Sequence, residues 1–155
     1  MHNFTFNHIA ISIKDVTKSI DFYQKVLGLK EIENTASNSK TRWLSLNEDR
    51  QLHLIPRPNL EVKTNKAVHF ALSTAQFDAF ISHLNDLNIE YSDWKDTPTK
   101  DYLRKDGIKQ IYFQCQSTSP ACPWLRQGCQ AVSQCDQSLL CPVFYLEFHL
   151  NSMPI

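Results

Sequence analysis

An internal repeat constrains the fold of this sequence more than any other feature. A shift of 61 positions carries the segment 8–12 onto the segment 69–73, and both alternate apolar residues with other residues. A period of two is typical of a β-strand that buries one face. In both copies an amphipathic helical pattern follows the strand. The chain should therefore contain two copies of one structural unit.

The first copy, residues 1–60, shows a complete unit. Asp15 or Thr17 can cap the helix at its start, and Gly28 can end it because glycine adopts a positive φ at little cost. A strand after the helix is followed by two alternating runs that a polar turn separates, which predicts a hairpin. The expected elements are a helix over 16–27 and strands over 8–13, 29–32, 41–46 and 51–55. This order is βαβββ.

The second copy, residues 66–114, repeats this order only in part. Its strand 69–73 and its helix are followed by a restarted strand at 89–91, with Asn88 in place of Gly28 as the left-handed cap. The run 107–114 matches the first arm of the hairpin, but no return arm is visible directly after it. We therefore predict an α+β fold of two tandem βαβββ modules, the second missing its last strand or irregular there.

Residues 115–155 differ in composition from the rest of the chain. All 5 cysteines lie there, at spacings that match neither a zinc knuckle nor a redox pair. The segment contains no lysine, and its only charged residues are Arg126, Asp136 and Glu147. We treat it as an atypical tail, with a strand possible near 143–150.

Charge and hydropathy exclude some partners. The formal net charge is +0, which argues against a nucleic-acid surface. No run approaches the roughly 20 apolar residues that a membrane span needs. The first residues lack the basic and apolar regions of a signal peptide, so we expect a cytoplasmic protein.

Three histidines are candidate metal ligands. His8 and His69 occupy equivalent positions in the repeat, and His53 lies on the last strand of the first unit, alternating with Leu52 and Leu54. A histidine on a strand is ordinary when taken alone. Three imidazoles on one sheet face, two of them related by the repeat, would bind a divalent metal.

Four segments resemble the vicinal oxygen chelate superfamily, which includes glyoxalase I, fosfomycin-resistance enzymes, extradiol dioxygenases and bleomycin-binding proteins. They are NHIAISIKDVTKSIDFYQKVLGLK, QLHLI, AVHFALS and GIKQIYFQ. The resemblance implies paired modules that form a cupped mixed sheet around a metal, with ligands at His8, His53 and His69. The family's fourth ligand is a glutamate on the last strand. Glu147 or Cys122 could take that place, or neither, which would leave three histidines and water.

The resemblance also implies a chemistry. In glyoxalases the metal stabilises an enediolate while the glutamate removes a proton, a role that only Glu147 could fill here. The arginine that glyoxalase I carries after its first histidine is not evident, and Ala10 stands where fosfomycin enzymes carry threonine. Candidate pocket residues are Arg42, Trp43, Arg57, Trp94, Tyr102 and Arg104.

These observations together predict a glyoxalase-like metal enzyme, a lyase of the glyoxalase I type. Its substrate would be a small oxygenated or thiol-conjugated molecule, and its metal Zn or Ni, with Mn, Co or Fe as further options. One alternative is a metal-free sequestering protein of the bleomycin-resistance type. Another is an inactive variant with a disrupted C-terminus. We expect no nucleic-acid or membrane partner, and a homodimer is possible because family members often pair.

Overall fold

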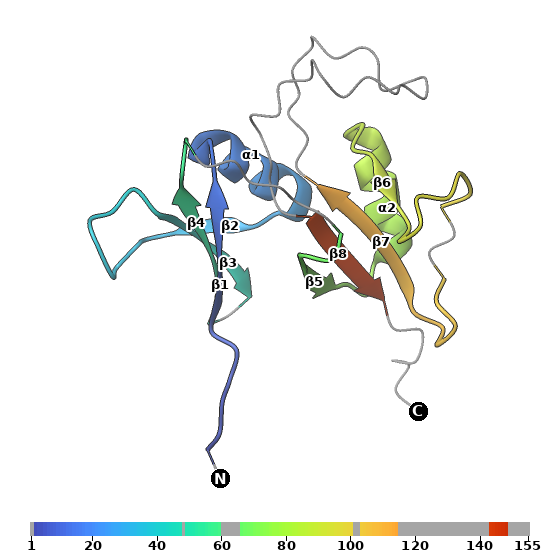
Figure 1. The fold of residues 1–155 in the computed structure, drawn as a ribbon, viewed down its shortest axis with the longest axis horizontal. Helices are drawn as coiled ribbons and strands as arrows, with labels where there is room; N and C mark the ends of the chain where they lie inside the picture. Colours follow the sequence, from blue (N-terminus) through green and yellow to red (C-terminus); the bar gives the residue numbers. More distant parts are fainter. Residues whose placement is uncertain (1, 48, 60–65, 101–102, 115–142, 149–155) are drawn as a thin grey trace.

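A computed structural model describes residues 2–47, 49–59, 66–100 and 103–114, together with the backbone of 143–148 (Figure 1). The first module comprises β1 (His8–Ile13), α1 (Val16–Leu27), β2 (Lys30–Ile32), β3 (Arg42–Asn47) and β4 (Arg50–Pro56). Its sheet has the order β1-β4-β3-β2. The pair β1–β4 is parallel, whereas β2–β3 and β3–β4 are antiparallel. The first module therefore has the predicted βαβββ order.

The signals at the ends of α1 act as the sequence predicts. Asp15 is the N-cap, and its side chain accepts a hydrogen bond from the backbone N–H of Lys18 at 3.1 Å. Gly28 ends the helix in the left-handed conformation, with φ 66°. Between these caps, Ile20, Tyr23 and Val26 are buried and form the core face of the helix.

The second module repeats the first. It comprises β5 (His69–Ser73), α2 (Phe77–Asp86), β6 (Tyr91–Ser92), β7 (Lys109–Gln114) and β8 (Val143–Phe148). The sheet order β5-β8-β7-β6 mirrors β1-β4-β3-β2, with β5–β8 parallel and β7–β8 antiparallel. The last strand is thus not missing: β8 takes the place that β4 has in the first sheet. Its position in the chain is irregular, because residues 115–142 separate it from β7.

The end of α2 also follows the sequence. Asn88 follows the C-cap Leu87 and has φ 54°, so it occupies the left-handed region as predicted.

The two modules contact each other near this end. Nε2 of His83 on α2 lies 3.1 Å from the carbonyl oxygen of Lys25 on α1.

Alternation along the strands separates a core face from an open face. Leu52 and Leu54 of β4 are 0% exposed and pack with Leu44 of β3 in the hydrophobic core. The core also includes Ile111 and Phe113 of the second sheet. Side chains that alternate with these residues point to the other face of each sheet. That open face carries the candidate site.

No helix among the described residues is long and apolar enough to span a bilayer.

Candidate metal centre

Strand register brings two of the three candidate histidines together on the open face of the first sheet. His53 pairs with Ala10 of β1 on one side and with Trp43 of β3 on the other. Residues paired across a sheet point to the same face, and so do residues two apart along a strand. His8, His53 and Trp43 therefore share the face opposite Leu52 and Leu54.

His53 lies in the middle of a three-ring stack. Its imidazole lies 4.2 Å from that of His8, centroid to centroid, with 13° between the planes. On its other side the Trp43 indole lies at 4.2 Å and 4°. Metal-binding lone pairs lie in the plane of an imidazole, so one ion must lie in the planes of both rings that bind it. Stacked, nearly parallel rings do not meet this condition, so His8 and His53 do not chelate one ion in this arrangement.

The environment of His53 favours its neutral form. Burial lowers the pKa of His53, and the neighbouring His8 lowers it further. Its Nε2 lies 2.8 Å from the side-chain oxygen of Gln51. A neutral ring with a carboxamide beside it can stack on Trp43 without a cost for burying charge.

His69 lies at the start of β5, as His8 does at the start of β1. Its Nδ1 is 2.6 Å from the carbonyl oxygen of Lys66, and its ring meets Tyr112 edge to face at 5.7 Å and 89°. A carbonyl oxygen only accepts, so Nδ1 carries the proton and donates. Such a bond is the usual support of a histidine that binds metal through Nε2.

The fit of these donors to a metal differs between the three histidines. His8 resembles His69, because its Nδ1 lies 2.8 Å from the side-chain oxygen of Asn7. Both rings thus suit metal binding through Nε2, whereas His53 in its stack does not. No group of three His, Cys, Asp or Glu side chains close enough to hold an ion occurs within the described residues. The joint ligation by His8, His53 and His69 therefore stays a prediction.

The register of β8 places Val143 opposite His69 and the backbone of Glu147 four residues further along the strand. Glu147 pairs with Ser73 of β5, while Tyr145 pairs with Ala71 and so occupies the position that His53 has in the first sheet. Glu147 is thus two residues beyond the strict repeat equivalent of His53. Its side chain, like Cys122, lies outside the described residues.

The structure accounts for several of the predicted pocket residues in other ways. Arg42 pairs with Leu54 and points away from the stack, where its Nη2 donates to Glu31 at 2.6 Å and the hydrogen bond raises the pKa of Arg42. Arg104 forms an ion pair with Asp106 at 2.5 Å.

The other pocket candidates are placed as follows. Arg57 donates to the carbonyl of Pro56 at 3.1 Å. Trp94 is 49% exposed, and its ring lies 5.6 Å from that of Tyr112. Tyr102 is outside the described residues, and Trp43 contacts the candidate ligand His53 directly.

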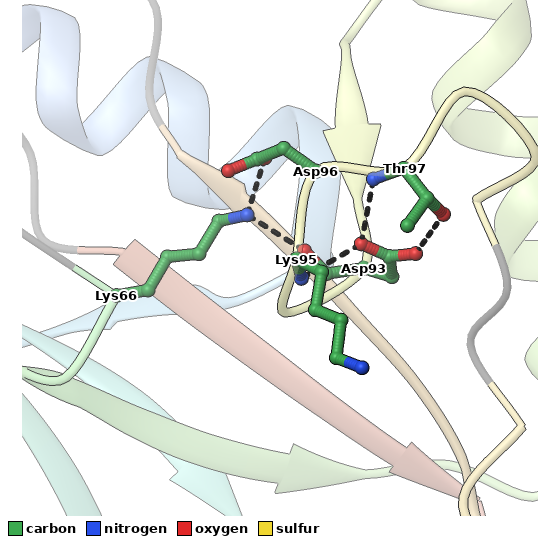
Figure 2. Close-up of polar contacts among 5 residues, drawn as sticks. All are labelled: Lys66, Asp93, Lys95, Asp96 and Thr97. Atoms are coloured by element: carbon green, nitrogen blue, oxygen red, sulfur yellow. Dashed lines mark hydrogen bonds and ion pairs between the residues drawn. The ribbon is translucent and has the colours of Figure 1, made fainter.

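Sequence reasoning missed a polar network beside His69 (Figure 2). Asp93 is 4% exposed, and its Oδ1 accepts from the backbone N–H groups of Lys95 at 2.8 Å and Thr97 at 3.0 Å. Its Oδ2 accepts from the Thr97 hydroxyl, which is the main reason that the pKa of Asp93 is lowered. The available signal was the Asp-x-Lys-x-Thr spacing, because aspartate often accepts from the backbone two residues ahead.

Comparison with known proteins places this geometry in context. The sequence profile of the Glyoxalase/Bleomycin resistance protein/Dioxygenase superfamily matches residues 5–105. The chain is 30% identical to metallothiol transferase FosB of Staphylococcus haemolyticus over 112 residues, covering 69% of this chain and 73% of the relative. It is 29% identical to FosB of Staphylococcus saprophyticus over 116 residues, covering 70% and 68%.

Solved structures share the fold at low sequence identity. A putative glyoxalase family protein from Bacillus anthracis superposes with a TM-score of 0.63 at 16% identity, covering 96% of this chain and 98% of that one. The fosfomycin resistance protein FosX from Mesorhizobium loti gives 0.56 at 13% identity, covering 98% and 97%. TnmS3, an antibiotic binding protein from Streptomyces sp. CB03234, gives 0.55 at 17% identity, covering 96% and 98%.

Proposed function

The chain belongs to the Glyoxalase/Bleomycin resistance protein/Dioxygenase superfamily, and we propose that it is a divalent-metal enzyme acting on a small oxygenated molecule. The observation that carries this proposal is the equivalent placement of His8 and His69. Each begins the first strand of its module, and each has Nδ1 bonded to an oxygen, which leaves the ring oriented for a metal at Nε2.

The proposed ligands are His8, His69 and Glu147. Glu147 is included because it is the one carboxylate of β8, the strand that pairs with β5, although the register sets it opposite Ser73 rather than His69. Two imidazoles and a carboxylate suit Zn or Ni, with Mn, Co or Fe as further options. When bound, such a cation supplies Lewis acidity toward the substrate oxygens that bind it. His53 and Trp43 then form a flat wall beside the metal rather than part of its ligand shell.

Thiol transfer is the reaction that the relatives favour. The FosB proteins, whose name describes a metallothiol transferase, match more than two thirds of this chain. A glyoxalase I type isomerisation, which the sequence alone suggested, has weaker support because the arginine after His8 is not evident. Ala10, where fosfomycin enzymes carry threonine, argues that the acceptor is a different oxygenated molecule. In either reaction Glu147 is the candidate base.

A homodimer would complete the proposed site. In one chain the described residues do not gather three donors. The first module offers His8, and the second offers His69 with Glu147, so a second copy could bring complementary modules together. The cytoplasmic location stays a prediction of the sequence.

A metal-free binding protein is the second candidate, and the ring stack favours it. The surface of His8, His53 and Trp43 offers a flat aromatic platform to a planar ligand. TnmS3, which shares the fold, is described as an antibiotic binding protein. This role would need no ion.

Metal analysis combined with activity assays tests these proposals. We expect the purified protein to bind one Zn or Ni ion per site, with binding lost in His69→Ala and His8→Ala and kept in His2→Ala, an exposed histidine outside the site. Loaded protein is assayed for addition of cysteine or glutathione to fosfomycin and other epoxides, and for isomerisation of hemithioacetals. Wild-type protein that binds no metal but binds bleomycin-type antibiotics would establish the second candidate instead.

A further inference from the structure

Lys66 connects the turn before His69 to the loop between β6 and β7. Its Nζ donates to the carbonyl of Asp93 at 2.6 Å and also contacts the carboxylate of Asp96 (Figure 2). The same residue contributes the backbone carbonyl that accepts from His69 Nδ1 at 2.6 Å. One lysine therefore joins a loop about thirty residues away in sequence to the imidazole of a candidate ligand.

The loop that holds Lys66 is itself rigidly built. Asp93 is buried and closes the turn by accepting from two backbone N–H groups and a hydroxyl of the residues that follow. Asp96 has a left-handed backbone, φ 56°, which turns the chain back toward Lys66. The ammonium of Lys66 lowers the pKa of Asp96 through their hydrogen bond. Because Asp93 is fixed, the carbonyl to which Lys66 donates is also fixed.

Tyr112 forms the third support of this arrangement. It is 6% exposed, its ring meets His69 edge to face, and Lys66 Nζ lies 5.6 Å from its centroid. The His69 ring is thus held by a carbonyl on one side and by an aromatic ring on another. His8 differs, because its Nδ1 partner is the amide side chain of Asn7, which can rotate.

We propose that Lys66 is a positioning residue for His69: by anchoring its own carbonyl to the 93–97 loop, it fixes the tautomer and direction of the imidazole. This inference rests on the proposed function in one respect: the imidazole is oriented so that Nε2 can bind a metal. The half of the site on the second module is then preorganised before any ion arrives, whereas the support of His8 is the side chain of Asn7.

Nitrogen NMR of the metal-free protein tests this inference directly. In protein labelled with ¹⁵N-histidine, two-bond ¹H–¹⁵N spectra at neutral pH report which ring nitrogen carries the proton, and His69→Gln identifies the His69 signals. We expect the Nδ1–H tautomer in wild type, its loss in Lys66→Met and its return in Lys66→Arg. Lys95→Met is the matched control, because the Lys95 ammonium points away from the network in Figure 2.

A second variant distinguishes the loss of the Lys66 contact from a general loss of structure. Asp96 has a side chain that is 70% exposed, so Asp96→Asn should fold normally and still shift the His69 tautomer in the same direction. A wild-type tautomer pattern in folded Lys66→Met and Asp96→Asn would overturn the inference.

Zinc titration of the same variants separates this inference from the proposed function. Because Lys66→Met loses the support of His69, its zinc affinity should fall by about 10–100-fold. The zinc affinity of Lys95→Met should equal that of wild type. Wild-type protein that binds no zinc would refute the proposed function, while the tautomer spectra would still decide the role of Lys66. Equal zinc affinity in wild type and Lys66→Met would refute the role of Lys66 and leave the function standing.

Discussion

His53 lies flat against Trp43, with ring centroids 4.2 Å apart and only 4° between the planes. The contact follows from register, because the two residues are direct partners between β3 and β4. The family resemblance implies that His53 is a metal ligand. In the structure its ring is instead part of an aromatic wall.

The stack predicts that His53 can be removed without loss of the metal. In His53→Ala we expect zinc affinity to fall by less than the 10–100-fold typical of a lost supporting residue, because the ring planes of His8 and His53 do not converge. His69→Ala should lose far more. Isothermal titration with zinc measures both. A loss in His53→Ala as large as in His69→Ala would show that His53 leaves Trp43 to bind the ion.

We expect the stability of the fold to fall in acid because of Asp93. Its folded-state pKa lies below the unfolded value, which is about 3.9. Its contribution to stability is therefore complete above that unfolded value and is lost as the pH falls through the lower folded value. Asp93→Asn removes the charge, keeps one oxygen for the backbone N–H groups of Lys95 and Thr97, and replaces the oxygen that accepts from the Thr97 hydroxyl with an NH2 donor. We therefore expect about 1–3 kcal/mol of destabilisation at pH 7. Urea unfolding measures the free energy of unfolding of both proteins, and the difference between the variant and wild type should become smaller toward pH 3.

The matched control for Asp93 is Asp21→Asn on the exposed side of α1. This variant should match wild type within about 0.5 kcal/mol at pH 7. A gap between Asp93→Asn and wild type that stays constant down to pH 3 would contradict the assignment to the charged carboxylate.

Replacing Gly28 should lower stability through backbone conformation alone. A Cβ at this position would meet nothing within 4 Å, yet φ is 66°. Gly28→Ala should therefore destabilise the protein by about 1 kcal/mol through backbone strain alone. Gly28→Asn should cost less, because asparagine tolerates the left-handed region, as Asn88 does in the second module. Thermal unfolding of both variants measures the difference, and equal melting temperatures would be inconsistent with strain as the cause.

Leu52 predicts the largest loss of stability. It is 0% exposed in the core beneath the ring stack. Leu52→Ala should cost about 2–5 kcal/mol, measured by denaturant unfolding. Leu103 is 56% exposed, so Leu103→Ala serves as a control with an expected change within about 0.5 kcal/mol. Similar midpoints for the two variants would argue against the described core.

Local sequence signals predicted the local structure well. The repeat with its shift of 61 positions predicted both modules. Asp15 and Gly28 cap α1 as expected, and Asn88 adopts the expected left-handed backbone just after α2. These features depend on residues a few positions apart, where spacing and backbone preference decide the outcome.

Features that depend on distant residues were harder to predict. The strand β8 lies beyond residues 115–142, and no period in the sequence tells how far a chain travels before it returns to a sheet. Lys66 meets its partners 27 and 30 positions away. The stack of His53 on Trp43 requires side-chain conformations that alternation alone does not specify. Long-range pairing and rotamers are set by tertiary packing, which a single sequence encodes only indirectly.

The central place of β8 in the second sheet has a consequence for biosynthesis. Every strand of the first module has left the ribosome once Pro56 has emerged, so that module can assemble early. β5 and β7, by contrast, are joined only through β8, and their shared edges stay unpaired until residues 143–148 have been made. The second sheet therefore completes its hydrogen bonding later in synthesis than the first sheet does.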